Sequence, residues 1–232
     1  LTETFVFTAP YMQHDTNDIN PAIKDAAEAI QTDTLFKTAM LGLKYKFMNQ
    51  TDALLHGDLH TGSIMVNEKD TYVIDPEFAF VGPFGFDVGA VIGNLIMAWV
   101  SHFERSCDGT YREWILETIE AVLVQFESKF LALWEDTKQS ALIEQGFIDE
   151  AGLRIYKKTF MLNLFHDTLG FAGAKMARRQ LGVAGVADIR ALQNPERARA
   201  EVKALDIAKR LVKEHQQIHT PRELIALLRA MA

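Results

Sequence analysis

The sequence predicts a mainly α-helical fold that carries one small β-hairpin. Apolar residues recur at helical spacing through most of the chain, and one short stretch alternates apolar and polar residues around a polar turn. The composition, 48% hydrophobic and 24% charged over 232 residues, is typical of a globular protein. A chain of this length can bury a substantial core, as one large domain or two smaller ones.

Charge and cysteine content exclude several function classes. The net charge is −7 and no dense run of Lys and Arg occurs, so we expect no nucleic-acid partner. The single cysteine, Cys107, excludes an internal disulfide and a multi-cysteine metal site, and it fits a reducing, cytoplasmic setting. The most apolar stretch, Val88–Val100, is shorter than the ~20 residues of a membrane span, and no signal peptide is visible. We therefore expect no membrane partner.

The first elements are a predicted strand and one or two helices. The opening residues, Leu1–Pro10, read as a strand followed by a turn. The pair Asn20 and Pro21 is typical of a helix start, since Asn caps and Pro suits the first helical position. The pattern over Ala22–Met48 predicts one long helix or two shorter ones.

Further helices follow in the second half of the chain. Val88–Val100 is predicted to be a buried helix, in which Gly89 and Gly93 let a neighbouring backbone approach closely. Apolar residues at three-to-four spacing predict an amphipathic helix over Arg112–Lys138. Additional helices are expected to begin near Glu150, at Asn194-Pro195, and at Thr220, where "TPREL" has the pattern of a capping box.

The strand signals lie next to an unusually polar loop. The stretch "SIMVNEKDTYVID" predicts a hairpin with its turn at Asn67–Asp70 and its second strand ending on Asp75. Immediately before it stands "LLHGDLHTG", in which histidines, glycines and Asp58 are packed between apolar residues. Loops of this kind on a rigid scaffold often carry chemistry.

The hairpin is expected to bring Asp75 back beside Asp58. This pairing suits phosphoryl transfer, in which one carboxylate accepts the proton of the attacking hydroxyl and a second holds Mg²⁺ against the nucleotide phosphates. Protein kinases have a catalytic-loop Asp, an Asn five residues later and a strand-end Asp. Here Ser63 stands where that Asn is expected, and Glu77, two residues after Asp75, is able to supply the missing oxygen.

Structural interpretations of the same loop residues compete with this one. Asp58 alone between two glycines would be read as a turn former, and Asp75 and Glu77 as solvated acids at a strand end. The spacing of these carboxylates favours a role in catalysis over a structural one. His56 and His60 are expected to be scaffold residues, and we expect Asp87 in "GFDVG" to anchor the loop.

Two further pairs of polar residues have simpler interpretations. Arg178 and Arg179 precede Gly182 and are typical of a solvated helix end, where cations suit the helix dipole. His215 and His219 have the i, i+4 spacing of metal ligands, but no third ligand is evident, so we expect a surface pair.

The central motifs resemble those of a known enzyme family. "HGDLHTGSIMV" and "VIDPEFAFVGPFGFDVGAVIGNL" resemble the 5-methylthioribose kinases of methionine salvage, within the wider aminoglycoside phosphotransferase and choline kinase group. The resemblance is tight over Leu54–Leu95 and looser to about Ala187, where "GAKMARRQLGVAGVADI" is similar to the family's tandem-arginine segment. Relatives outside the methylthioribose branch usually have Asn at the position of Ser63.

The resemblance implies the C-terminal lobe of a protein-kinase-like fold, with residues 1–232 as that lobe and the catalytic loop and metal site at residues 54–95. It implies transfer of the γ-phosphate of ATP to the 1-hydroxyl of 5-methylthioribose, with ATP and Mg²⁺ as cofactors and a homodimeric assembly. Neither a glycine-rich nucleotide loop nor its lysine precedes Asp58, so we expect the N-terminal nucleotide-binding lobe to be absent from this chain.

The same resemblance implies the roles of individual residues. Asp58 is the base or hydroxyl orienter and contacts the substrate. Asp75-Pro76-Glu77 binds the nucleotide and its metal, with Asp75 and Glu77 as Mg²⁺ ligands. Arg178 and Arg179 stabilise the charge of the transferred group and contact the substrate.

Two alternatives remain open at this point. One is a related kinase acting on another sugar, an aminoglycoside or an amino alcohol. The other is a catalytically inactive kinase-like binding module, against which the presence of Asp58, Asp75 and Glu77 argues.

Overall fold

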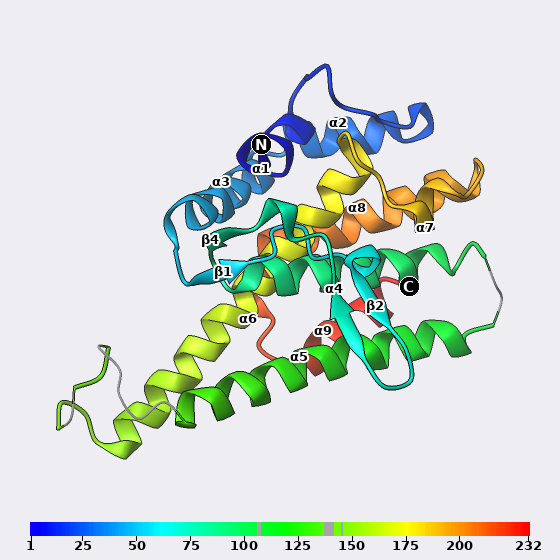
Figure 1. Ribbon diagram of the computed structural model, residues 1–232. Coiled ribbons are helices and arrows are strands. Elements are labelled where there is room, and N and C mark those ends of the chain that lie inside the picture. Colours follow the sequence, from blue (N-terminus) through cyan, green and yellow to red (C-terminus); the bar gives the residue numbers. More distant parts are fainter. Residues whose placement is uncertain (106–107, 137–141, 145) are drawn as a thin grey trace.

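The computed structural model describes residues 1–105, 108–136, 142–144 and 146–232. Within them the protein is mainly helical with two small antiparallel sheets, which is the predicted fold class (Figure 1). The helices are α1 (Thr2–Phe5), α2 (Lys24–Thr32), α3 (Thr34–Asn49), α4 (Gly85–Ser101), α5 (Thr110–Asp136), α6 (Glu150–Leu181), α7 (Ala187–Arg190), α8 (Glu196–Glu214) and α9 (Pro221–Ala230). The strands are β1 (Ala53–Leu55), β2 (Ile64–Val66), β3 (Thr71–Val73) and β4 (Phe80–Gly82).

Helix α4 runs through the middle of the molecule and contacts several of the other helices (Figure 1). Helices α6, α8, α5 and α7 all pack against it, and α1 to α3 lie on the opposite side of the molecule from α5 and α9 (Figure 1). The largest fully buried side chains include Trp99 on α4, Phe36 on α3 and Phe171 on α6. None of the helices in the described part of the chain is long and apolar enough to cross a membrane.

The predicted hairpin is confirmed. Strands β2 and β3 pair antiparallel, with Ile64 opposite Val73 and Val66 opposite Thr71. The Asn67 side chain closes the turn by accepting hydrogen bonds from the backbone N–H groups of Lys69 (2.8 Å) and Asp70 (2.7 Å). Asn67 is thus the local reason that the chain reverses here.

A second sheet, which the sequence did not predict, encloses the polar loop and the hairpin. Strand β1 pairs with β4, with Ala53 opposite Gly82 and Leu55 opposite Phe80. This ladder holds together the two ends of the segment 56–79, which contains the loop and the hairpin. Each of its strands has three residues, too short for a clear alternating pattern in the sequence.

Several helix boundaries follow the predicted caps. Asn20 accepts a hydrogen bond from the backbone N–H of Ala22. The expected helical region splits into two because Asp33 is extended and caps α3 through the N–H of Phe36. Thr220 caps α9 through the N–H of Glu223. The predicted helix over residues 112–138 corresponds to α5, while Lys138 and Cys107 lie outside the described residues.

The strand predicted at the start of the chain is wrong. Residues 2–5 form the short helix α1 instead, and the neighbouring residues Val6 and Phe7 are both buried. A half-buried strand would point them to opposite faces. The Phe7 ring packs against those of Phe47 (5.2 Å between centroids) and Phe171 (6.2 Å), so burial in the helical core decides the local structure.

Helices α4 and α6 approach one another through glycines, as predicted for Gly89 and Gly93. A Cβ atom on Gly89 would lie 2.6 Å from the carbonyl oxygen of Thr168 and 2.9 Å from the amide nitrogen of Ala172. One turn further on, a Cβ atom on Gly93 would lie 2.9 Å from the Ala172 carbonyl oxygen. The two backbones are therefore in direct contact, and this contact fixes the position of α6 along α4.

Replacing Gly89 tests this contact. We expect Gly89→Ala to lower the free energy of unfolding by about 1–3 kcal/mol, because the new Cβ meets backbone atoms that must move. Gly42→Ala in α3 is the matched control, since nothing lies within 4 Å of a Cβ there. It should be neutral or stabilising by roughly 0.5–1 kcal/mol, because Ala favours a helix. Urea unfolding followed by circular dichroism measures both, and equal effects would contradict the close approach.

Candidate active site

The polar loop after β1 is held by a buried carboxylate on α4. Asp87 accepts hydrogen bonds from the backbone N–H groups of His56 (2.6 Å) and Gly57 (3.1 Å). Only 7% of Asp87 is exposed. Hydrogen bonds to an ionised acceptor in such surroundings are strong. The predicted anchor role of Asp87 is confirmed.

Gly57 is needed for the backbone path of the loop. Its φ is +88°, and a Cβ atom there would lie 2.1 Å from the carbonyl oxygen of Phe78. Glycine alone tolerates both the left-handed backbone and this contact. The loop therefore passes directly against the turn that follows Asp75.

His56 connects the loop to the end of the hairpin, as expected of a scaffold residue. Its Nε2 donates to the carbonyl oxygen of Ile74 (2.7 Å), and its Nδ1 accepts from the N–H of Asp58 (3.3 Å). Because a carbonyl oxygen only accepts, the Nε2 atom carries the proton. The N–H of Ile74 donates in turn to the Ser63 carbonyl oxygen at 3.0 Å. Ile74, the neighbour of Asp75, is thus bonded to the loop on both sides.

Ser63 completes the loop from inside. It is 3% exposed, and its hydroxyl donates to the carbonyl oxygen of Asp58 at 3.2 Å. Ser63 stands at the position where protein kinases have a metal-binding Asn. Here its hydroxyl holds the backbone of Asp58 instead.

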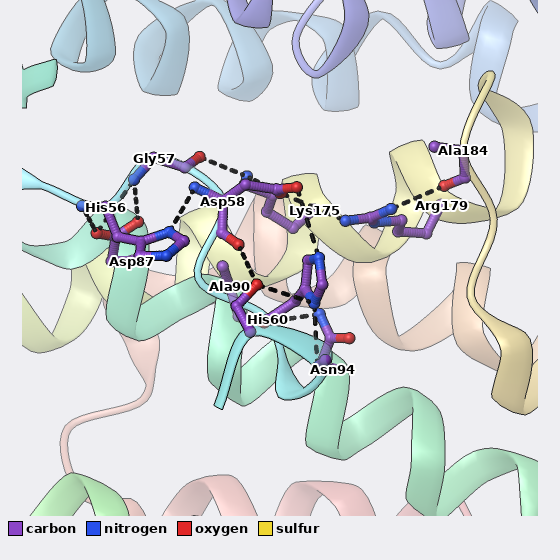
Figure 2. A network of polar contacts seen from close by, with 12 residues as sticks. His56, Gly57, Asp58, His60, Asp87, Ala90, Asn94, Lys175, Arg179 and Ala184 are labelled. Atoms are coloured by element: carbon purple, nitrogen blue, oxygen red, sulfur yellow. Dashed lines mark hydrogen bonds and ion pairs between the residues drawn. The ribbon is translucent and has the colours of Figure 1, made fainter. Parts of the chain in front are cut away.

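The side chain of Asp58 lies between α6 and the loop, among cations (Figure 2). Its Oδ1 is 3.4 Å from Nη2 of Arg179 and 3.6 Å from Nζ of Lys175, and its Oδ2 is 3.6 Å from Nε2 of His60. Burial raises the pKa of Asp58, but the charges of Lys175 and Arg179 outweigh it and hold this pKa below its usual value. Asp58 is therefore ionised at neutral pH.

The last turns of α6 carry three cations that burial makes harder to charge. Burial lowers the pKa of Lys175 to about 8 and that of Arg178 to about 10, and it also lowers the pKa of Arg179. The side chain of Arg179 is 10% exposed and donates to the Ala184 carbonyl oxygen at 3.3 Å. The interpretation of this pair as a solvated helix end is wrong, because α6 ends inside the molecule.

All three of these cations have incomplete hydrogen bonding, and the Nε atom of Arg179 is buried without a partner among the described residues. The Nε and Nη1 atoms of Arg178 are buried and have no hydrogen-bond partner within the described residues. Lys175 has only long contacts, 3.5 Å to the Gly57 carbonyl oxygen and 3.6 Å to Asp58. Buried donors of this kind are normally satisfied, so they suit an anion that binds beside them.

Sequence reasoning missed Lys175. A signal was present, because Lys175 stands four residues before Arg179 on the predicted helix and therefore shares its face. Its surroundings hid it, since the residues around it on α6 are small or apolar and almost all buried.

A cavity of about 200 Å³ opens beside Asp58. Its polar side consists of Asp58, Lys175 and Arg178, and its apolar side includes Phe78 and residues of the N-terminal segment. The full lining is Leu1, Thr2, Phe5, Val6, Gly57, Asp58, Phe78, Lys175 and Arg178. A small amphipathic molecule would fit a cavity of this kind.

Asp75 and Glu77 are exposed at the end of the hairpin. Neither carboxylate makes a hydrogen bond or ion pair with another described residue. Asp75 has φ +61°, and it is the one non-glycine residue in the described ranges with a left-handed backbone. Such strain clusters at functional sites.

Asp75 and Glu77 suit a Mg²⁺ site with few protein ligands, and they do not form a metal site made of protein ligands alone. The described part of the chain contains no group of three or more metal-ligating side chains. Mg²⁺ is typically held by one or two carboxylates, with phosphate oxygens and waters completing its coordination. The free carboxylates of Asp75 and Glu77 meet that requirement.

The two histidines near the C-terminus do not form a surface pair. His215 is buried and its Nδ1 donates to the Val212 carbonyl oxygen at 3.0 Å, whereas His219 is exposed. The ring of His219 lies 5.6 Å from that of His166 on α6. The prediction failed for His215 because packing against α6 buries the turn after α8.

Comparisons with known proteins support one family. A family model described as the phosphotransferase enzyme family matches residues 7–123, which include Asp58, Asp75, Glu77 and Asp87. Methylthioribose kinase 1 of Oryza sativa subsp. japonica is 42% identical over 97% of this chain and 54% of its own length. The methylthioribose kinases of Escherichia coli O45:K1 and Bacillus pumilus are 39% and 35% identical, over 94% and 98% of this chain and 54% of their own lengths. The chain thus spans about half the length of the curated relatives it matches.

The anchor can be tested independently of activity. We expect Asp87→Asn to speed hydrogen exchange of the His56 and Gly57 amides by about one to two orders of magnitude, because a neutral acceptor replaces a charged one (about 1–3 kcal/mol). Asp52→Asn is the control, since Asp52 is exposed and accepts from the Phe84 N–H at 3.4 Å. Unchanged exchange of both loop amides in Asp87→Asn would show that Asp87 does not hold the loop.

Proposed function

We propose that this chain, which belongs to the phosphotransferase enzyme family, carries the substrate and metal half of a kinase that phosphorylates the 1-hydroxyl of 5-methylthioribose with ATP in methionine salvage. The observation that carries the proposal is the ionised Asp58, lying between buried cations at one side of an amphipathic cavity. The names of the similar proteins supply the substrate.

Asp58 orients the attacking hydroxyl. The hydroxyl donates its hydrogen bond to the Asp58 carboxylate, its oxygen forms the new bond to the γ-phosphorus, the bond to ADP breaks, and the proton passes to Asp58. The lowered pKa makes Asp58 a weak base, which suits a loose transition state in which positioning matters more than early deprotonation.

Arg178 and Arg179 stabilise the charge of the transferred group. Three cations of α6 face the single carboxylate of Asp58, which leaves an excess of positive charge beside the cavity. The unpartnered guanidinium nitrogens of Arg178 are suited to the equatorial oxygens of a phosphoryl group.

Asp75 and Glu77 would hold Mg²⁺, and Pro76 between them shapes the turn that presents both. The ion would neutralise charge on the nucleotide phosphates. Asp75 lies next to Ile74, which is bonded to the loop on both sides, so the two acids stand beside the loop that carries Asp58.

The cavity beside Asp58 suits a methylthio sugar. Sugar hydroxyls would bond to Asp58 and Arg178, and the apolar methylthio group would contact Phe78 and Phe5. An aminoglycoside, which carries several positive charges, would meet the cations of α6 instead. This charge argument favours the neutral sugar over the related alternatives.

The remaining parts of the proposal follow from the family resemblance. The chain forms the C-terminal lobe, and the glycine-containing loop and lysine that bind ATP phosphates belong to another part of the full-length protein, in keeping with the 54% of the relatives' length that the chain covers. The enzyme is cytoplasmic and homodimeric. Phosphorylation by the full-length protein of a panel containing 5-methylthioribose, ribose, an aminoglycoside and choline tests the substrate, and preference for another acceptor would refute it.

The role of Asp58 predicts a large loss of rate. In the full-length enzyme, Asp58→Asn should lower kcat by about 10²–10⁴-fold with little change in ATP affinity, because the amide cannot take the proton. Steady-state kinetics and nucleotide titration measure the two quantities. Asp70→Asn in the exposed hairpin turn is the control and should leave both unchanged. Turnover near the wild-type rate in Asp58→Asn would remove the assignment.

The role of Glu77 predicts a change in metal dependence. Glu77→Gln should raise the Mg²⁺ concentration needed for half-maximal rate, because an amide oxygen is a weaker ligand for this ion. Glu68→Gln, at an exposed turn position of the same hairpin, should leave the Mg²⁺ dependence unchanged. Identical Mg²⁺ curves for the two variants would exclude Glu77 as a ligand.

A further inference from the structure

Lys175 is a buried charge on α6, in the part of this helix that lies in the core. Its side chain is 6% exposed, in a stretch of α6 where almost every residue is buried. An ammonium group in such a position costs free energy unless it is paired. Its neighbours are Asp58 at 3.6 Å, the Gly57 carbonyl oxygen at 3.5 Å and the ring of Phe86, whose centroid is 4.3 Å away.

A second buried lysine of the same helix shows what an ordinary structural role looks like. Lys157 makes a direct ion pair with Glu135 at 2.5 Å and lies over the Trp134 ring, with its Nζ 5.2 Å from the centroid. Glu135 is exposed to solvent, and neither residue of that pair lines the cavity beside Asp58. Lys175 differs because its contacts are long and its carboxylate partner borders the cavity.

The two oxygens of Asp58 have different surroundings. Lys175 and Arg179 approach closest to Oδ1, whereas His60 approaches closest to Oδ2. The Nδ1 atom of His60 accepts from the Gly62 N–H at 3.1 Å, so its Nε2 carries the proton and faces Oδ2 as a donor. Oδ1 is thus held by two cations, and Oδ2 keeps a free acceptor position.

The position of Lys175 is set by helix packing. It stands three residues after Ala172, whose backbone touches both Gly89 and Gly93 of α4. Asp58, by contrast, belongs to a loop. Because Lys175 is fixed by the packing of α4 against α6, its contact with Asp58 restricts the position of the carboxylate.

We propose that Lys175 is a positioning residue that fixes the Asp58 carboxylate through Oδ1, so that Oδ2 receives the hydroxyl of the substrate. The inference rests on the proposed kinase function and deepens it. Lys175 need not touch the substrate, because it acts through Asp58.

The pH dependence of the reaction gives a readout that a purely structural role would not move. The charged and titratable groups around this contact are Lys175, Arg178 and Arg179 of α6, His60 of the loop, Asp87 of α4, and Tyr11, which faces Arg178. Burial raises the pKa of Asp58 and the charge of Lys175 lowers it, so removal of that charge raises the pKa of Asp58. The acid limb of kcat/KM therefore moves to higher pH.

The test compares Lys175→Met with Lys157→Met in the full-length enzyme. Lys175→Met should shift the acid limb upward by about one pH unit or more and lower kcat by about 10- to 100-fold. Lys157→Met should shift neither. Lys175→Arg should return the acid limb toward the wild-type position because the charge is restored. Equal pH profiles for the two methionine variants would overturn the proposal.

Two further measurements keep the outcome decisive. Because the pKa of Lys175 is about 8, wild-type kcat/KM should fall as pH rises through that value, and Lys175→Arg should move this fall to higher pH. An identical alkaline limb in both enzymes would contradict the role even if Lys175→Met does not fold. If the wild type does not phosphorylate 5-methylthioribose, the proposed function fails. In that case the contact is tested separately, by NMR titration of the Asp58 carboxyl carbon in the wild type and in Lys175→Met. An unchanged titration would show that Lys175 does not act on Asp58.

Discussion

The close contact between α4 and α6 is the constraint on which the rest of the site depends. Gly89 and Gly93 bring the two helix backbones together, and this contact fixes the polar groups carried by each helix. The first turn of α4 supplies Asp87, which holds the loop through its amides, and the last turns of α6 supply the cations that face Asp58. A loop with few apolar contacts of its own is thereby held from both sides by rigid helices, which is the usual way to obtain a precise site from irregular backbone.

Electrostatics at this site combine two opposing effects. Burial disfavours the charge of Asp58 and of each cation, and their mutual attraction restores it. Because three cations surround one carboxylate, the attraction is unequally shared and Arg178 keeps nitrogens without a partner. The protein thus holds a preorganised region of positive potential that an anionic group would complete, with one carboxylate inside it. The acidic pair at Asp75 and Glu77 lies on the exposed side, where a cation is able to enter with part of its water shell.

Much of this arrangement could be predicted from the sequence, because its signals are local. The hairpin turn at Asn67, the caps at Asn20 and Thr220, and the close helix contact at Gly89 each depend on a few neighbouring residues. Features that depend on distant residues were missed. The β1–β4 ladder joins two three-residue strands across the whole loop, and the burial of His215 and Lys175 is decided by packing between helices. The N-terminal segment has the apolar content of a strand, yet no strand pairs with it among the described residues. Residues 2–5 form a helix, and Phe7, in the turn after it, packs against Phe47 and Phe171.

The left-handed backbone of Asp75 has a consequence for the evolution and engineering of this fold. An L-residue in that conformation is disfavoured by about 1–2 kcal/mol, and glycine adopts it freely. Asp75→Gly would thus relieve strain in the folded state and partly offset the larger conformational freedom of the unfolded chain. The backbone conformation does not require an acid at this position. Only the chemistry of the carboxylate requires one. A selection for thermal stability alone would exert almost no pressure to keep this residue, so stabilised variants of the protein are at risk of losing the proposed metal ligand without any visible defect in folding.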